Sequence, residues 1–389
     1  MHGLNSNIPK DANGELLANQ SEGNFQRPSR RTFLGGVAAA GASALLSSRP
    51  SHAQTGTAAN PRRIDFHHHF QAPELMGIAR AKGLNPPPPV WTLAKALEDM
   101  DKGGTATTLL SGIEIPGGLD KDAETVRKTL RIQNDYAAKL RSDYPGRFGL
   151  LALIPLALND IDGCMREIDY ACGTLNADGF VVMTSYDLRY VGDAVWMPVY
   201  EELNRRKAIV FVHPHSPSCC SWIAKPAPQT VVEYGADTTR VIANLLFSGL
   251  AHKFADITWV FAHGGGMMPY VIERFLNATT EEIVPGIVTK GQGGKGVLGD
   301  NPRRDVMPNG VLYELRRMYY DTAQCSNPVA MGALRKVVPV SQIVFGTDFH
   351  WRTAEETGRG LITSKIFNEA ELHAINRGNA ERILPRYRT

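Results

Sequence analysis

The chain has 389 residues, of which 43% are apolar, and a formal net charge of +3 at pH 7. This length is enough for one large buried core, and much of the small positive excess comes from arginines near the N-terminus. The composition therefore excludes the basic footprint of a nucleic-acid-binding protein and favours a small-molecule partner.

The first predicted element is an export signal. Residues 29–54, SRRTFLGGVAAAGASALLSSRPSHAQ, place paired arginines before an Ala/Gly-rich apolar segment and a small-residue cleavage site at 51–53. The apolar run at 33–46 is too short and too rich in glycine to span a bilayer. We expect a twin-arginine signal peptide at 1–53, a linker at 54–61, and a mature protein in a bacterial periplasm without a membrane anchor.

From residue 62 onward, short β-branched runs alternate with amphipathic stretches. The stretches at 93–104, 123–146 and 237–254 carry apolar residues at the spacing of one helix face. Strands that are apolar almost throughout and alternate with helices indicate a parallel sheet buried on both faces. Eight such units predict an α/β fold, a single (β/α)₈ TIM barrel over residues 62–389. The candidate strands are 62–70, 105–113, 148–156, 177–185, 208–215, 257–265, 318–324 and 342–350.

Two segments match neither the strand pattern nor the helix pattern. Residues 84–91 are rich in proline and residues 284–310 are rich in glycine, and we expect both to be loops that cover a pocket. The GQGGKG within the second segment has no strand before it, so we interpret it as loop and not as a nucleotide site. The five cysteines include no CxxC pair, which indicates neither a disulfide framework nor a zinc knuckle.

Three consecutive histidines interrupt the first predicted strand, RIDFHHHF. In a regular strand, alternate side chains share a face. We therefore expect Asp65, His67 and His69 to project together, and His68 to point to the opposite side, against the helical layer.

Other ionisable residues stand at the C-terminal ends of later strands, which form the active-site face of a (β/α)₈ barrel. The residues expected to meet there are His67, His69, His213, His263 and Asp348. Neutral imidazoles and a carboxylate suit a divalent transition metal and leave a position for water or substrate. We expect Zn²⁺, with Mn²⁺ as the alternative.

These residues resemble the amidohydrolase superfamily, which carries HxH on strand one, histidines on strands five and six, and Asp on strand eight. The segments HGGGMMPYVIER (263–274), YDTA (320–323) and FGTDF (345–349) are similar to its decarboxylase branch. That branch includes aminocarboxymuconate semialdehyde decarboxylase and 6-methylsalicylate-type decarboxylases. The resemblance covers residues 62–389.

The resemblance implies roles for individual residues. It makes His67, His69, His213 and Asp348 the metal ligands, and His263 and Asp348 the catalytic pair. It also makes Arg274 the group that binds a substrate carboxylate, across the interface of a homodimer. Strand four ends VVMTS, without the lysine that bridges two ions in dinuclear relatives, so a single metal ion is expected.

The implied activity is non-oxidative decarboxylation of a small aromatic or unsaturated carboxylic acid. Protonation of the carbon that bears the carboxylate would allow CO₂ to leave, with the metal drawing off electron density. A metal-bound hydroxide can also attack a lactone, an ester or an amide. A metal-dependent hydrolase therefore stays open as the alternative.

Overall fold

The computed structural model describes residues 60–82, 91–112, 122–156, 160–186, 189–217, 219–220, 226–277 and 305–388. The predicted export signal, nearly all of the linker, and most of the Pro-rich and Gly-rich loops lie outside these residues. No helix among the described residues is long and apolar enough to cross a membrane.

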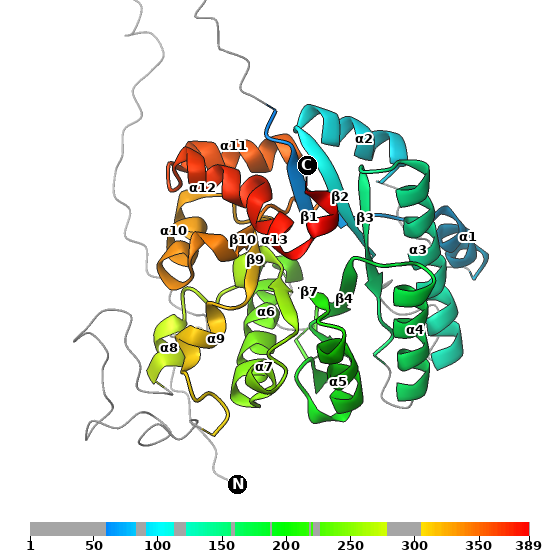
Figure 1. Ribbon diagram of the computed structural model, residues 1–389, viewed down its shortest axis with the longest axis horizontal. Helices are drawn as coiled ribbons and strands as arrows, with labels where there is room; N and C mark the ends of the chain where they lie inside the picture. Colours follow the sequence, from blue (N-terminus) through cyan, green and yellow to red (C-terminus); the bar gives the residue numbers. More distant parts are fainter. Residues whose placement is uncertain are drawn as a thin grey trace, which may run out of the picture. The chain divides into compact units, whose positions relative to one another are not determined.

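Eight parallel strands form one sheet in the order β1-β2-β3-β4-β7-β8-β9-β10 (Figure 1). They confirm the eight predicted strands, although each is shorter than its sequence pattern, and β5 (Ser185–Tyr186) and β6 (Arg189–Tyr190) form a separate antiparallel pair. The bounds are β1 Arg63–His69, β2 Thr105–Ser111, β3 Phe148–Leu153, β4 Gly179–Met183, β7 Ile209–His213, β8 Thr258–Phe261, β9 Tyr319–Asp321 and β10 Ile343–Val344.

Backbone hydrogen bonds between β1 and the chain around β10 bring the two ends of the sheet together. Phe66 N donates to Phe345 O at 2.9 Å, and Asp348 N donates to His67 O at 2.9 Å. His68 and Phe349 form a further parallel bridge. The sheet therefore curls into the (β/α)₈ barrel that the alternation predicts, with its first and last strands adjacent.

Helices surround this sheet (Figure 1). Those before β7 are α1 Pro73–Ala81, α2 Leu93–Lys102, α3 Ala123–Asp143, α4 Ile161–Gly173 and α5 Met197–Arg205. Those after β7 are α6 Gln229–Phe247, α7 Leu250–Lys253, α8 Ile272–Asn277, α9 Val311–Leu315, α10 Pro328–Val337, α11 Ala354–Ser364, α12 Glu369–His373 and α13 Asn379–Ile383.

Local capping sets several helix starts, because a side-chain oxygen satisfies a free backbone N–H group there. Thr92 accepts from Lys95 N before α2, and Asp122 accepts from Thr125 N before α3. The single helix predicted at 237–254 is wrong in one respect, since it is two helices. The chain breaks at Gly249, whose φ of 79° a glycine adopts without steric cost.

Alternate residues of each strand belong to different cores. In β7, Ile209 and Phe211 pack in a cluster made mainly of strand residues, whereas Val210 and Val212 pack in the larger cluster that includes the helices. His213 follows Phe211 by two positions and so continues the inward-facing row. The alternation that places Ile209 and Phe211 inside the barrel therefore also places the His213 imidazole at the barrel mouth.

Candidate metal centre

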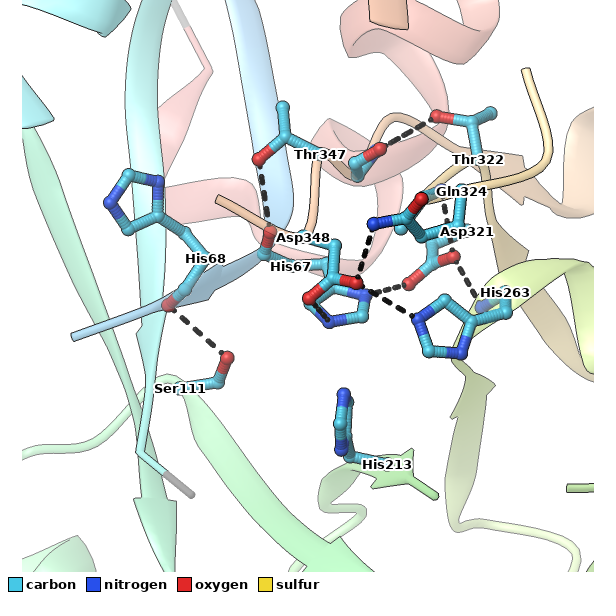
Figure 2. Close-up of polar contacts among 12 residues, drawn as sticks. His67, His68, Ser111, His213, His263, Asp321, Thr322, Gln324, Thr347 and Asp348 are labelled. Carbon is cyan, nitrogen blue, oxygen red and sulfur yellow. Dashed lines mark hydrogen bonds and ion pairs between the residues drawn. The ribbon is translucent and has the colours of Figure 1, made fainter. Parts of the chain in front are cut away.

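The structure brings together the five residues that the sequence placed at the barrel mouth. His67 Nε2 lies 3.1 Å from His69 Nε2, which lies 3.2 Å from His213 Nε2. Asp348 Oδ1 lies 3.3 Å from His67 Nε2 and 3.1 Å from His69 Nε2, and its Oδ2 lies 3.3 Å from His263 Nε2. Figure 2 shows Asp348 between His67 and His263, with His213 approaching from β7.

Hydrogen bonds on the far sides of two rings decide which nitrogens face the cluster. His67 Nδ1 lies 2.6 Å from the Asp321 carboxylate, and His69 Nδ1 lies 3.2 Å from the carbonyl oxygen of Ser111. Both partners are acceptors, so each neutral ring carries its proton on Nδ1 and a lone pair on Nε2. Two lone pairs at 3.1 Å repel each other unless a positive charge lies between them.

The spacing fits a metal ion. Ligands about 2.0–2.1 Å from a tetrahedral zinc ion lie roughly 3.3–3.4 Å from one another. The measured separations of 3.1–3.3 Å are close to that value. One ligand atom from each of His67, His213, His263 and Asp348 lies within 4.8 Å of the others, and the donor set of imidazoles and one carboxylate is that of a mononuclear transition-metal site.

Charge points to the same conclusion. Asp321 is fully buried and Asp348 is 6% exposed, and among the described residues neither forms an ion pair with lysine or arginine. Buried carboxylates are costly unless a cation compensates them, and a protonated His67 ring balances only one of the two negative charges. The site therefore attracts a cation into a space lined by nitrogen lone pairs.

The pKa values of the cluster reflect burial and these charges. Burial lowers the pKa of His67, but Asp321 and Asp348 outweigh it and raise the pKa to about 10. Burial and the neighbouring imidazoles lower the pKa of His69 and that of His213. Burial alone would raise the pKa of Asp348, but the imidazoles hold it well below its usual range. Without an ion, His67 therefore carries a proton that a metal would have to displace, because neutral imidazoles and an ionised carboxylate are the forms that bind a metal.

One expectation about the first strand is wrong. Regular alternation predicts that Asp65 faces the cluster, but the pairing of β1 with β2 shifts register between Asp65 and His68. Phe66 and His67 both pack against Phe211 as a result. Such a bulge puts two successive side chains on one side. Asp65 instead lies 3.4 Å from His68 Nδ1 and accepts a hydrogen bond from Thr347 Oγ1 at 2.8 Å.

His68 is confirmed on the opposite side of β1 from the cluster (Figure 2). Its ring stacks on Phe349 with centroids 4.5 Å apart, and its Nε2 accepts a hydrogen bond from Trp91 Nε1 at 3.3 Å. The side chain is fully buried. His68 is therefore a core residue that joins β1 to the segment before α2.

Sequence reasoning missed Asp321 as a member of the site. Its carboxylate binds His67 Nδ1 through Oδ2, and its Oδ1 accepts from the backbone N of His263 at 2.7 Å and of Ala323 at 3.0 Å. The signal was present, because Asp321 ends strand β9 in the same way that His213 ends β7. Asp321 fixes both the His67 ring and the backbone of His263.

Gln324 was missed as well, and nothing in the strand pattern marks it. Its Nε2 donates to Asp348 Oδ2 at 3.2 Å. Gln324, His263 and Asp348 all have positive φ, of 56°, 55° and 64°. Strained backbone of this kind is concentrated at functional sites. It directs the side chains of His263 and Gln324, which follow β8 and β9, toward one oxygen of Asp348. Asp348 therefore offers Oδ1 to His67 and His69, and Oδ2 to His263 and Gln324.

Arg274 lies apart from the cluster. It is exposed on α8, and within the described part of the chain it makes no hydrogen bond or ion pair with the cluster residues. The five cysteines are free thiols, as the absence of a disulfide pattern predicted. Strand β4 ends at Met183 and is followed by Thr184, so no lysine stands there.

Comparison with known proteins gives the context of this geometry. The family model described as amidohydrolase matches residues 64–386. The chain is 32% identical over 293 residues to the 6-methylsalicylic acid decarboxylase of Penicillium expansum, an alignment that covers 74% of this chain and 84% of that protein.

Two solved structures show a similar fold. The crystal structure described as an amidohydrolase II superposes with a TM-score of 0.70 at 22% identity, over 83% of this chain and 99% of that chain. A dihydroxybenzoic acid decarboxylase from Polaromonas sp. JS666, with bound manganese and the inhibitor 2-nitroresorcinol, superposes with a TM-score of 0.66 at 20% identity. That match covers 84% of this chain and 98% of that chain.

Proposed function

The chain belongs to the amidohydrolase family, and we propose that it is a metal-dependent non-oxidative decarboxylase of a small aromatic carboxylic acid of the methylsalicylate type. The observation that carries this proposal is the cluster of His67, His69, His213 and Asp348 in a chain that shares 32% identity with a 6-methylsalicylic acid decarboxylase. The hydrolase alternative is not favoured, because the relatives at 29–32% identity are described as decarboxylases.

The residues divide between holding the ion and handling a proton. His67, His69, His213 and Asp348 Oδ1 would hold the ion. When bound, a divalent ion supplies a positive charge that fixes the substrate oxygens and draws electron density from the ring. His263 is left to act on the substrate, because its Nε2 lies 3.3 Å from Asp348 Oδ2, whereas His67 and His69 lie against Asp348 Oδ1.

Proton delivery falls to His263 and Asp348. Decarboxylation of an aromatic acid requires a proton on the ring carbon that bears the carboxylate, after which the C–C bond breaks and CO₂ leaves. A proton held between His263 Nε2 and Asp348 Oδ2, 3.3 Å apart, is placed at the mouth of the barrel for that transfer. Gln324 donates to the same oxygen and keeps its orientation. Positioned proton transfer of this kind contributes about 10²–10⁴ in rate.

We propose Zn²⁺ as the ion, because imidazole nitrogens and a carboxylate oxygen are ligands that it takes, and their separations of 3.1–3.2 Å fit its bond lengths. Manganese is the alternative, since a relative of similar fold binds it. Metal analysis of the purified protein decides between them.

We also propose that the protein is exported to the periplasm and acts as a homodimer in which Arg274 binds a substrate carboxylate. The paired arginines at 30–31 support export. Arg274 is exposed on α8, close in sequence to Tyr270, which is 62% exposed, and we propose that this surface meets a second subunit. A guanidinium group binds carboxylates through two parallel hydrogen bonds.

A substrate screen tests the proposed activity. The mature protein is incubated with 6-methylsalicylate and dihydroxybenzoates, and with a matched set of aromatic lactones and esters, while CO₂ and acid release are recorded. We expect CO₂ from at least one hydroxybenzoate, loss of that activity after chelation, and recovery on adding Zn²⁺. Acid release from lactones or esters without CO₂ from any acid would reject the proposal in favour of a hydrolase.

A further inference from the structure

A second group of polar side chains surrounds a cavity of about 720 Å³ at the opposite end of the barrel. Its lining includes Thr105, the first residue of β2, and Arg62 and Arg147, which directly precede β1 and β3. The strands are parallel and the metal ligands lie at or beyond their C-terminal ends, so this cavity lies at the other face. The arginines that line it are Arg62, Arg147, Arg377, Arg386 and Arg388.

The cavity carries more positive than negative charge. Asp101 is its one acidic lining residue, and it already pairs with Arg147 at 2.7 Å. Carboxylates just outside the lining pair with Arg377 and Arg386. Within the described part of the chain, no ion pair compensates Arg62 or Arg388.

Two hydrogen-bond donors in the lining also lack a partner among the described residues. They are the hydroxyl of Thr105, a residue that is 4% exposed, and the Nε–H group of Arg147. Buried donors without a partner are uncommon in native proteins, and each calls for an acceptor. The cavity therefore combines surplus cations with unused donors.

We propose that this cavity is a non-catalytic binding site for a small multivalent oxyanion. Guanidinium forks bind phosphate and carboxylate oxygens through paired hydrogen bonds, and Arg62 and Arg388 are exposed in the lining and would supply them. The volume is in the range of small-molecule sites and exceeds the needs of a single water or chloride. The ligand would join the starts of β1 and β2 to the C-terminal residues Arg386 and Arg388.

Such a ligand binds the folded chain and not the unfolded one, so it raises thermal stability by mass action. The test records the melting temperature at constant ionic strength in sodium chloride, inorganic phosphate and citrate. We expect a saturable rise of about 2–6 °C in phosphate or citrate over chloride. Phosphate and citrate together show whether phosphate or carboxylate oxygens are preferred.

Variants of arginines inside and outside the cavity lining test whether the rise in melting temperature comes from this site. Arg62 and Arg388 are exposed, so the double variant R62Q/R388Q should fold and lose the rise, whereas R359Q, an exposed arginine on α11, should keep it. Chelated protein should still respond, which separates this site from the metal centre. Equal melting temperatures in all three salts, or an undiminished rise in R62Q/R388Q, would overturn the proposal.

Discussion

Asp321 Oδ2 lies 2.6 Å from His67 Nδ1, on the side of the imidazole away from the other ligand atoms. This contact holds the His67 ring in the tautomer that turns a lone pair toward the cluster. Partners of this kind typically contribute 10- to 100-fold to metal affinity.

Asp321→Asn should therefore weaken metal binding by about 10- to 100-fold, because an amide cannot offer the same negative acceptor. Titration with a competing chelator measures the affinity, and excess metal should restore most of the activity. Asp99→Asn, which changes a buried carboxylate on α2, serves as the control. An unaltered affinity in Asp321→Asn would exclude this role.

Substitutions of the neighbouring residues His67 and His68 on β1 should differ in their effect on metal binding. His67→Ala should lose the bound metal, whereas His68→Gln should keep it and melt at a lower temperature, because His68 is a buried acceptor for Trp91. Metal content by mass spectrometry and a melting curve distinguish the two. Equal metal loss in both variants would mean that the two sides of β1 have been misassigned.

Substitution of His263 should lower the rate of the reaction and leave most of the metal bound. His263→Gln should keep most of the metal and lower kcat by about 10²–10⁴, because the proton carrier beside Asp348 Oδ2 is removed. Steady-state kinetics and metal analysis of the same sample provide the readouts. If metal content falls in parallel with kcat, His263 is a ligand in place of a proton carrier.

Arg274→Lys should raise KM strongly for carboxylate substrates and change kcat little, because lysine cannot form two parallel hydrogen bonds to a carboxylate. Sedimentation analysis of the same variant reports whether the subunits still associate. Arg359→Lys on α11 is the matched exposed control. Kinetics that match those of the wild type would remove Arg274 from the substrate site.

The raised pKa of Asp99 should make the free energy of unfolding depend on pH. Burial, together with nearby carboxylates, raises its pKa from 3.8 to about 7, although its carboxylate accepts a hydrogen bond from Ala354 N at 3.1 Å. The protonated form is favoured in the folded state, so the stabilisation is complete below about pH 4 and is lost as pH rises through about 7.

The free energy of unfolding of the wild type should accordingly fall between about pH 4 and pH 7 by more than that of Asp99→Asn. Urea unfolding across this range, with the exposed Glu74→Gln as control, measures the difference. Identical pH slopes for wild type and Asp99→Asn would contradict the assignment.

The barrel and most of the cluster were predictable because both follow from local rules. Continuous apolar runs predict buried parallel strands, and His213 could be identified as a site residue because it ends such a run. His67 and His69 were placed correctly together although the regular alternation behind the prediction does not hold at Asp65. The two imidazoles still meet, with their Nε2 atoms 3.1 Å apart, although the register shifts between Asp65 and His68.

Other features depend on tertiary geometry that no local pattern encodes. Asp65 is turned away by a register shift set by the pairing of β1 with β2. Gln324 reaches Asp348 only because its backbone adopts positive φ. The contact between His67 and Asp321 joins positions 254 apart in the chain.

The seam between β1 and the end of β10 has a consequence for assembly of the holoprotein. His67 belongs to the first strand and Asp348 follows the last, and they become neighbours only when the ring closes through Asp348 N and His67 O. A growing polypeptide that has not yet produced residue 348 lacks a complete chelate. A complete set of ligands would therefore exist only after residue 348 has been made and the ring has closed, and a bound ion would resist reopening of the ring.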